Sequence, residues 1–348
     1  MKITVLPASK ISGSLAARWA EIQQDNPGLC SPFFRPEFTQ AVSAVRDDTY
    51  VAVIDDGTAF FPFQRSWLGF GRPIGGAVSD YHGLIAPPGY HCDIETLIRA
   101  CGLRYWDFDH VPAEQRAFIP WRTVDTESFV VDISTCESPI SGESRSRYAT
   151  KRRKLEREVG RVEVELESSD PEVLRQCIEW KSAQYRQTKI VDLFARPWAR
   201  ALAEGIAKTR GPDFSGMVSV LRAGGRPVAI HFGMRSNSVW HYWFPAYDPE
   251  FSRYSPGMLL LLDMMSAAPE RGLTSIDFGK GNMPYKQQLS NRIVPLIEGS
   301  VAAHRSLLIL RRSRTELLQW ARQAPLLRFV PARLRKLVWL AEQSGRFR

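Results

Sequence analysis

Residues 240–286 decide the fold class, and they read WHYWFPAYDPEFSRYSPGMLLLLDMMSAAPERGLTSIDFGKGNMPYK. The stretch begins in an apolar strand, passes through the helix-like residues 255–270 and returns to a short strand at 275–278. Pro256 stands early in the helix and Gly272 just past its end, which is typical of a helix start and stop. A strand, a helix and a second strand in this order predict a crossover between strands of one sheet.

Three strands that follow one another directly are expected upstream of this crossover. Residues 215–223, 226–236 and 239–244 read as strands, and Gly224-Gly225 and Asn237-Ser238 supply the turns between them. A final strand is expected at 294–303. The fold class predicted for this half is therefore α/β, with a mixed but mainly antiparallel central sheet flanked by helices.

The N-terminal half repeats this order in a weaker form. Helix-like residues 14–26 and 36–45 precede two strands, 50–54 and 58–64, which Asp55-Asp56-Gly57 joins as a hairpin. The repetition at about half the chain length indicates an internal duplication. The predicted division is an N-terminal degenerate unit at 1–135, a linker rich in Ser, Glu, Gly and Pro at 136–146, a catalytic unit at 147–304 and a basic helical tail at 305–348.

Composition excludes several classes of protein. Of the 348 residues, 44% are hydrophobic and 24% charged, which suits a folded protein of two domains. No stretch reaches the roughly 20 apolar residues that span a bilayer, and residues 1–10 do not resemble a secretory signal. The five cysteines are scattered without a CxxC pair, so we expect no disulfide framework, no metal site and a reducing cytoplasmic location.

The net charge of +9 comes from the last segment alone. Residues 305–348 hold eleven Lys/Arg and two Glu, whereas the other 304 residues hold 35 charges of each sign. Arginines alternate there with Leu, Trp and Phe, and Pro325 and Pro331 prevent one long helix. Such a segment predicts peripheral association with an anionic membrane surface, the alternative being a terminal helix packed on the body.

One group of candidate residues opens the helix at 255–270. The first turn of a helix carries unpaired N–H groups and a partial positive charge, which suit a phosphate or pyrophosphate. An ordinary capped helix is the alternative interpretation. The residues assigned here to a phosphate-bearing cofactor are Arg253, Tyr254, Ser255 and Gly257.

A second group follows the short strand at 275–278. Asp277 ends this strand, and Gly279 and Gly281 let the backbone approach a ligand closely, although a plain tight turn has the same composition. Lys286 is a candidate for stabilising an oxyanion, and Tyr285 for donating a proton to a leaving group.

Histidines and aromatic residues supply the remaining candidates. His231 is a candidate general base, as Asp277 is, because a histidine pKa lies near neutral pH. In both halves a structural role is the alternative for these side chains. The residues assigned to substrate, besides the two glycines above, are Asp80, Tyr81 and His82 in the polar cluster after the Gly-rich stretch, and His241 and Tyr242 in the third strand of the meander.

These motifs resemble those of the CelD/FemAB-like branch of the GNAT acyltransferase superfamily. The similarity covers roughly residues 30–305. It rests on SPFFRPEF, FPFQR, SDYHG and WDFDH in the first half, and on KRRKLERE, YDPEFSRYSPG, DFGKG and YKQQL in the second. The order of a meander followed by a crossover is also that of the acetyltransferase fold.

The resemblance implies tandem GNAT units that transfer an acyl group from a thioester or aminoacyl donor to an amine or hydroxyl. It implies acyl-CoA as co-substrate, and a cell-envelope or exopolysaccharide sugar, or a lipid-linked precursor, as acceptor. FemAB-type ligases carry a Phe-Lys pair where this chain has Tyr285-Lys286. The usual pyrophosphate loop is Arg/Gln-x-x-Gly-x-Gly/Ala, whereas this chain has Arg253-x-x-x-Gly257 with Leu259 in the later small position.

Two other functions stay open from the sequence. Because FemAB relatives use aminoacyl-tRNA, a tRNA-dependent peptide ligase is one alternative, and the basic run KRRK at 151–154 leaves room for a phosphate contact. Interleaved Glu156 and Glu158 favour a solvated helix face for that run. The other alternative is a non-catalytic GNAT-like component of a polysaccharide-synthesis complex.

Overall fold

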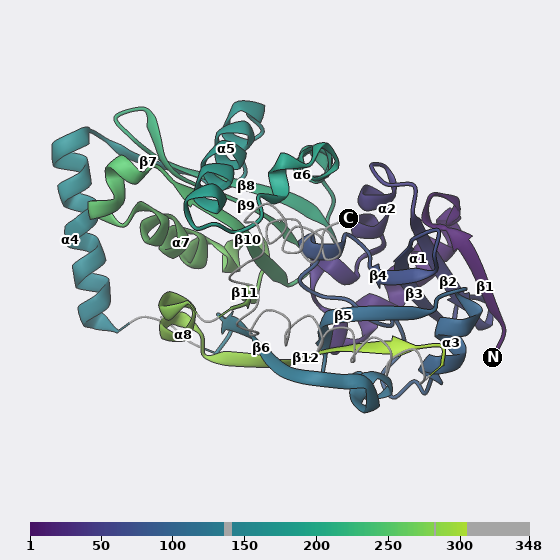
Figure 1. Cartoon of the computed structure of the whole chain (residues 1–348). Helices are drawn as coiled ribbons and strands as arrows, with labels where there is room; N and C mark the ends of the chain where they lie inside the picture. The colour runs from purple at the N-terminus through teal and green to yellow at the C-terminus, as the bar shows by residue number, and fades with distance from the viewer. Residues whose placement is uncertain (136–140, 282, 305–348) are drawn as a thin grey trace, which may run out of the picture.

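The computed structural model describes residues 1–135, 141–281 and 283–304, which form a twelve-stranded sheet with helices on both faces (Figure 1). In sheet order the strands are β1 (Ile3–Pro7), β2 (Thr49–Ile54), β3 (Ala59–Arg65), β4 (Phe70–Pro73), β5 (Tyr105–Pro112), β12 (Arg292–Ala302), β6 (Arg122–Asp132), β11 (Ser275–Lys280), β10 (Val239–Tyr247), β9 (Arg226–Arg235), β8 (Ser215–Ala223) and β7 (Val162–Glu165). The helices are α1 (Gly13–Asp25), α2 (Pro36–Ser43), α3 (Ile94–Ala100), α4 (Gly142–Val159), α5 (Pro171–Gln187), α6 (Pro197–Lys208), α7 (Pro256–Ala267) and α8 (Pro284–Leu289).

The strand order has a two-fold pattern that confirms the tandem fold. Each strand from β1 to β6 corresponds to the strand six later in chain order, so that β1 corresponds to β7 and β6 to β12. When every strand is replaced by its counterpart, the order read from one edge of the sheet is the order read from the other edge. The helices follow the same pattern, because α1 and α2 precede the β2–β3 hairpin as α5 and α6 precede β8 and β9. The duplication expected from the sequence is therefore present in the topology.

Each half contains one parallel strand pair, made by its crossover helix. The helix α3 connects β4 to β5, and α7 connects β10 to β11, and both pairs are parallel, whereas the other neighbours are antiparallel. A crossover helix is what allows two neighbouring strands to run in the same direction. The prediction of a mixed, mainly antiparallel sheet is confirmed.

The two halves exchange their last strands. The strand β12 pairs with β5 of the first half, while β6 pairs with β11 of the second half, and β12 and β6 also pair with each other. In Figure 1, yellow-green β12 accordingly lies along the first-half strand β6. This exchange joins the strands of both halves into one sheet.

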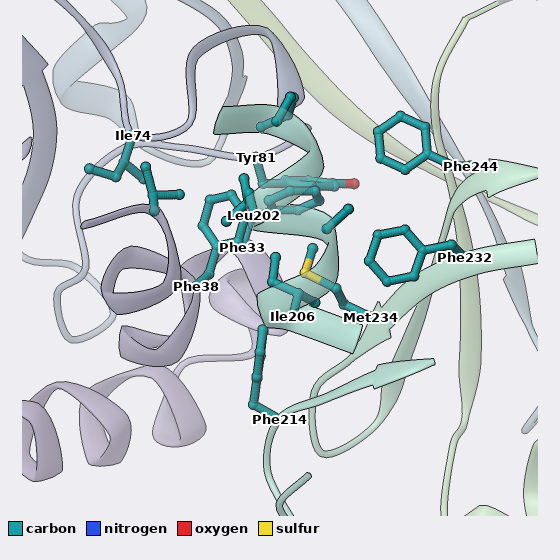
Figure 2. Packing of buried hydrophobic residues seen from close by; sticks show 14 of the residues in the cluster. Phe33, Phe38, Ile74, Tyr81, Leu202, Ile206, Phe214, Phe232, Met234 and Phe244 are labelled. Carbon is teal, nitrogen blue, oxygen red and sulfur yellow. The ribbon is translucent and has the colours of Figure 1, made fainter. Parts of the chain in front are cut away.

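A hydrophobic core also crosses between the halves. Figure 2 shows aromatic and aliphatic side chains from the first half packed against α6 and against β9 and β10 of the second. Full burial of one such side chain contributes roughly 1.5–3 kcal/mol. The labelled members are Phe33, Phe38, Ile74 and Tyr81 from the first half, and Leu202, Ile206, Phe214, Phe232, Met234 and Phe244 from the second.

The opposite face of the second half is covered by α7. Leu260, Leu261 and Met264 of this helix are buried against Trp240 and Ile276 of the parallel pair. The sheet is thus buried on both sides where β10 meets β11.

Most expected elements occur within a few residues of their expected positions. The Gly224-Gly225 turn is confirmed, and both residues have positive φ (56° and 78°), as a two-residue type I′ turn requires. The helix α4 begins at Gly142, within the range expected as the linker, because the Ser141 hydroxyl caps it by accepting from the Ser144 N–H at 3.2 Å.

Among residues 1–135, 141–281 and 283–304, no helix is long and apolar enough to cross a membrane. The basic segment 305–348 and residues 136–140 of the expected linker lie outside the described residues, so the expectations for their structure stay predictions.

Candidate active site

The centre of the site is the point where β10 and β11 separate. Their parallel register runs from Val239 opposite Ser275 to His241 opposite Asp277. Beyond it, β10 bulges against β9 between His241 and Phe244, and β11 shifts register against β6 after Asp277. Bulges of this kind re-aim side chains and free backbone groups from strand pairing. His241 and Asp277 therefore stand together where the two strands part.

His241 is held by a carboxylate from the other half of the chain. Its Nε2 lies 2.8 Å from Asp80 Oδ2, and its ring is fully buried against the edges of Phe33 and Tyr81. Burial opposes ionisation of Asp80, but the hydrogen bond and charge of His241 outweigh it and lower the Asp80 pKa. His241 Nδ1 has no hydrogen-bond partner among the described residues and lies 4.0 Å from Asp277 Oδ1.

Asp277 is fixed by two donors. Its Oδ1 accepts from the Ser128 hydroxyl of β6 at 2.7 Å and from the Gly279 N–H at 2.8 Å. The Asp277 side chain is buried. The exchanged strand β6 thus contributes directly to the site, a role for Ser128 that the sequence did not indicate.

Lys286 from α8 closes the site on the β11 side. Its Nζ donates to the carbonyl oxygens of Gly279 at 3.2 Å and Lys280 at 2.8 Å, and only 8% of the residue is exposed. Burial lowers the Lys286 pKa, and the nearby charges of Asp80 and Asp277 oppose this shift. A cation held in the interior beside two carboxylates is typical of a functional site.

Gly279 allows these groups to come so close. Its φ of 69° favours glycine, and a Cβ added here would lie 3.0 Å from Asp80 Oδ2 and 3.5 Å from the His241 ring. Gly281 also has positive φ, and a Cβ there would lie 3.6 Å from Lys286 Nζ. The two glycines singled out in the sequence therefore lie against the charged cluster.

Two residues of α5 join this cluster and were missed in the sequence. Lys181 Nζ donates to the Pro245 carbonyl oxygen at 3.2 Å and lies 5.4 Å from the centre of the Tyr185 ring. Burial lowers the Lys181 pKa to about 8, and the charge of Lys286 acts in the same direction. Burial also raises the Tyr185 pKa, and the charge of Asp80 contributes to that shift. The charged helix pattern gave no sign that these two side chains face inward.

Two tyrosines predicted for the site are also buried or half-buried nearby. Tyr81 has a buried hydroxyl without a hydrogen-bond partner among the described residues, and burial with the charge of Asp277 raises its pKa well above its usual value. Tyr285 packs its ring against Phe278, and burial raises its pKa to about 12. Both hydroxyls stay protonated at neutral pH and are able to donate a hydrogen bond.

His231 and Tyr242 lie apart from this cluster, in the core with Trp240. Their rings stack at 4.5 Å with only 4° between the planes. Neither His231 nitrogen has a hydrogen-bond partner among the described residues, and burial lowers the His231 pKa well below its usual value. The structure therefore does not bring His231 and Tyr242 into hydrogen-bond contact with Asp80, Asp277 or Lys286.

His82 lies behind Asp80, in a small group with Asp109 and His110 whose ligand atoms are within 4.8 Å of one another. Its Nε2 accepts from the backbone N–H groups of Asp109 at 3.1 Å and His110 at 3.0 Å. A nitrogen whose lone pair is used in this way cannot ligate a metal ion at the same time. The group is therefore a structural contact and not a preformed metal site.

The residues assigned to a phosphate lie at the start of α7, away from the cluster. Ser255 has a left-handed backbone (φ 54°), and its hydroxyl accepts from Lys151 Nζ of α4 at 2.6 Å instead of capping α7. Arg253 is exposed and bonds to Glu158 at 3.2 Å and to the Tyr254 hydroxyl. The sequence favours a solvated face for the KRRK run, whereas Lys151 of this run brings a cation to the start of α7.

Part of the chain is similar to a known family. Residues 142–287 match the family model described as an acetyltransferase (GNAT) domain. No curated protein sequence matches the chain significantly.

Solved structures resemble nearly the whole chain. FemX has a TM-score of 0.59 at 11% identity, over 89% of this chain and 99% of that one. The C-terminal DUF2156 domain of a putative lysylphosphatidylglycerol synthetase from Agrobacterium fabrum has a TM-score of 0.57 at 14% identity, over 88% and 96%. A conserved protein of unknown function from Bacteroides thetaiotaomicron has a TM-score of 0.53 at 13% identity, over 82% and 97%. At these identities the likeness shows the fold alone.

Proposed function

We propose that the protein is an acyltransferase that moves an acyl group from a thioester, acyl-CoA in the first instance, to an amine or hydroxyl. The observation that carries this proposal is the group formed by Asp80, His241, Asp277 and Lys286 where β10 and β11 separate. It combines a histidine oriented by a carboxylate with a buried cation, which are the two elements that acyl transfer needs.

In the proposed reaction, the acceptor nitrogen or oxygen attacks the thioester carbonyl carbon while its proton passes to His241 Nδ1. Asp80, bonded to Nε2, stabilises the imidazolium that forms. The Lys286 ammonium stabilises the negative charge on the carbonyl oxygen. The C–S bond then breaks, and the leaving thiolate accepts a hydrogen bond from Tyr285 and finally takes the proton held by His241.

The sequence left the general base open between Asp277 and His231. We favour His241, because its Nδ1 is unpartnered while Asp277 Oδ1 already accepts two hydrogen bonds. His231 has the same lack of partners, but its stacking on Tyr242 places it in the apolar core. We assign Asp277 to positioning His241 and the turn at Gly279.

The start of α7 is the proposed site for the donor's phosphates. An anion there is favoured by the partial positive charge of the helix N-terminus and by Lys151. For the acceptor, we propose a sugar of the cell envelope or an exopolysaccharide, or a lipid-linked precursor. This choice rests on the resemblance to the CelD/FemAB-like branch and on no contact in the site.

A second candidate is transfer from an aminoacyl-tRNA. Lys286 stands in place of the lysine of the FemAB Phe-Lys pair and is buried against the carbonyl groups that follow β11. The likeness to FemX is consistent with this candidate without favouring it over acyl-CoA. A non-catalytic component of a polysaccharide-synthesis complex is the third candidate, and it predicts that Lys286→Met keeps its cellular function.

Release of free CoA measures the proposed activity directly. With acetyl-CoA or longer acyl-CoAs and amino-sugar or sugar acceptors, His241→Asn and Lys286→Met should each lower kcat by about 10²- to 10³-fold. His231→Phe, which keeps a flat ring in the core, should leave kcat nearly unchanged. Loss of activity in His231→Phe with an active, folded His241→Asn would overturn the assignment of the base.

A further inference from the structure

The turn between β3 and β4 presents large apolar side chains to solvent. Trp67 is 92% exposed, and Leu68 and Phe70 are each 37% exposed. Turn corners normally carry small or polar residues, and exposed aromatic clusters of this kind mark interaction sites. No contact in the reaction proposed above involves this turn.

The backbone holds the turn in a fixed shape. The Gly69 N–H donates to the Ser66 carbonyl oxygen at 2.9 Å, and the Phe70 N–H donates to the Ser66 hydroxyl at 3.0 Å. Trp67 and Leu68 therefore occupy the two corner positions of a closed turn, while the Phe70 ring stacks on Tyr105 at 4.8 Å. The apolar corner requires no rearrangement to meet a partner.

Arginines outnumber aspartates around this corner. Arg65 and Arg72 flank the turn in sequence, and exposed Arg104 donates its N–H to the Gly69 carbonyl oxygen at 2.7 Å. Two acidic residues are nearby. Asp48 is paired with Arg46 at 2.7 Å and lies 3.7 Å from Arg72, and exposed Asp47 lines the same hollow as Trp67. A partner with negative charge and an apolar interior suits this arrangement.

The basic end of the chain starts at the same place. The Ala303 N–H donates to the Arg104 carbonyl oxygen at 2.9 Å, so the described chain ends one residue later beside the turn. The 44 residues that follow carry eleven Lys/Arg, two Glu, Trp320 and Trp339. A negatively charged surface attracts both this basic segment and the arginine-flanked turn.

We propose that the Ser66–Phe70 turn inserts Trp67 and Leu68 into the interface of an anionic lipid bilayer, beside the point where the basic segment 305–348 begins. Tryptophan at the level of the lipid headgroups, with arginines bound to anionic lipids, is a stable arrangement for a peripheral protein. The proposal does not depend on the acyl-transfer assignment.

Sedimentation of the full chain with vesicles tests this proposal. Vesicles of phosphatidylglycerol and phosphatidylcholine in equal parts should bind the wild type, and phosphatidylcholine alone should bind it much less. The double variant Trp67→Ser/Leu68→Ser should bind the mixed vesicles about tenfold more weakly. The matched control is Ile190→Ser/Val124→Ser, which removes two other exposed apolar side chains and should bind as the wild type does. Undiminished binding by the turn variant, or equal binding to both vesicle types, would overturn the proposal.

A fluorescence measurement distinguishes insertion of the turn from an indirect effect. Trp67→Phe keeps an apolar corner and should still bind. With brominated lipids in the vesicles, the wild type should lose more tryptophan fluorescence than Trp67→Phe, because Trp67 contacts the quencher. Equal quenching in the two proteins would show that Trp67 does not enter the bilayer and would contradict the proposal.

Discussion

Asp80 and His241 are 161 residues apart in the chain, yet their side chains form the hydrogen bond around which the site is built. The sequence singled out both residues, each as part of a local polar or aromatic run. It gave no sign that they pair, because the pairing depends on how the loop after β4 packs against β10. The same holds for Lys181, whose burial on α5 is set by tertiary packing that a charged helix pattern does not reveal.

The buried His82 makes stability depend on pH. Burial lowers the His82 pKa to about 3, against 6.5 in an unfolded chain. Between pH 6.5 and about pH 3, His82 is therefore protonated in the unfolded chain and neutral in the folded chain. The free energy of unfolding falls as the pH decreases through this range. At pH 5 the loss should be about 2 kcal/mol.

Urea unfolding measured between neutral pH and pH 5 checks this expectation. His82→Gln keeps a side-chain acceptor for the Asp109 and His110 N–H groups and removes the titration. Its free energy of unfolding should fall less steeply with acid than that of the wild type. Parallel slopes for the two proteins would mean that His82 is not buried in the neutral form.

At the scale of elements, sequence patterns located the strands of the second half and most helices, because apolar periodicity and turn residues were strong there. They missed β4, whose few residues include Gly71 and Pro73 and lie in a stretch that looks like a loop. They also extended the linker to residue 146, although α4 begins at Gly142, because Ser141 and the polar first turn resembled a linker.

Lys151 gives α4 a testable role at the start of α7. Lys151→Met keeps the length of the side chain and removes the ammonium group that bonds to Ser255. We expect acyl-CoA to bind about three- to tenfold more weakly, with kcat at saturation unchanged, since a cation near the phosphates affects binding alone. The control is Lys154→Met, which removes an exposed lysine from the same helix. Equal effects of the two substitutions on KM would contradict a specific contact.

At the scale of the whole molecule, the exchange of β6 and β12 makes the halves depend on each other. Removing either half would leave β5 or β11 with one neighbouring strand instead of two, and would expose the core that Figure 2 shows between the halves. The sequence indicated a duplication, because the order of helices and strands in its two halves is similar, and it therefore indicated a tandem fold. It could not indicate the exchange, since β6 and β12 read as ordinary strands of their own halves.

We therefore expect the chain to unfold in a single cooperative transition. In differential scanning calorimetry, the calorimetric enthalpy should equal the van't Hoff enthalpy. Two resolved transitions, one for each half, would show that the exchanged strands and shared core do not couple the halves.

The central claim is that α7 receives the phosphates of a CoA thioester, and thermal stabilisation by acetyl-CoA, longer acyl-CoAs and free CoA tests it most directly. A ligand at 100 times its Kd should add about 2.7 kcal/mol to the stability of the folded state. A side chain at Gly257 fits, because an added Cβ would only touch Tyr247 at 3.7 Å, and an acidic residue at a helix N-terminus favours the helix. The account predicts that the wild type and Gly257→Asn are stabilised and that the isosteric, charged Gly257→Asp is not. No shift of the wild type with any CoA, or an equal shift in Gly257→Asp, would contradict it.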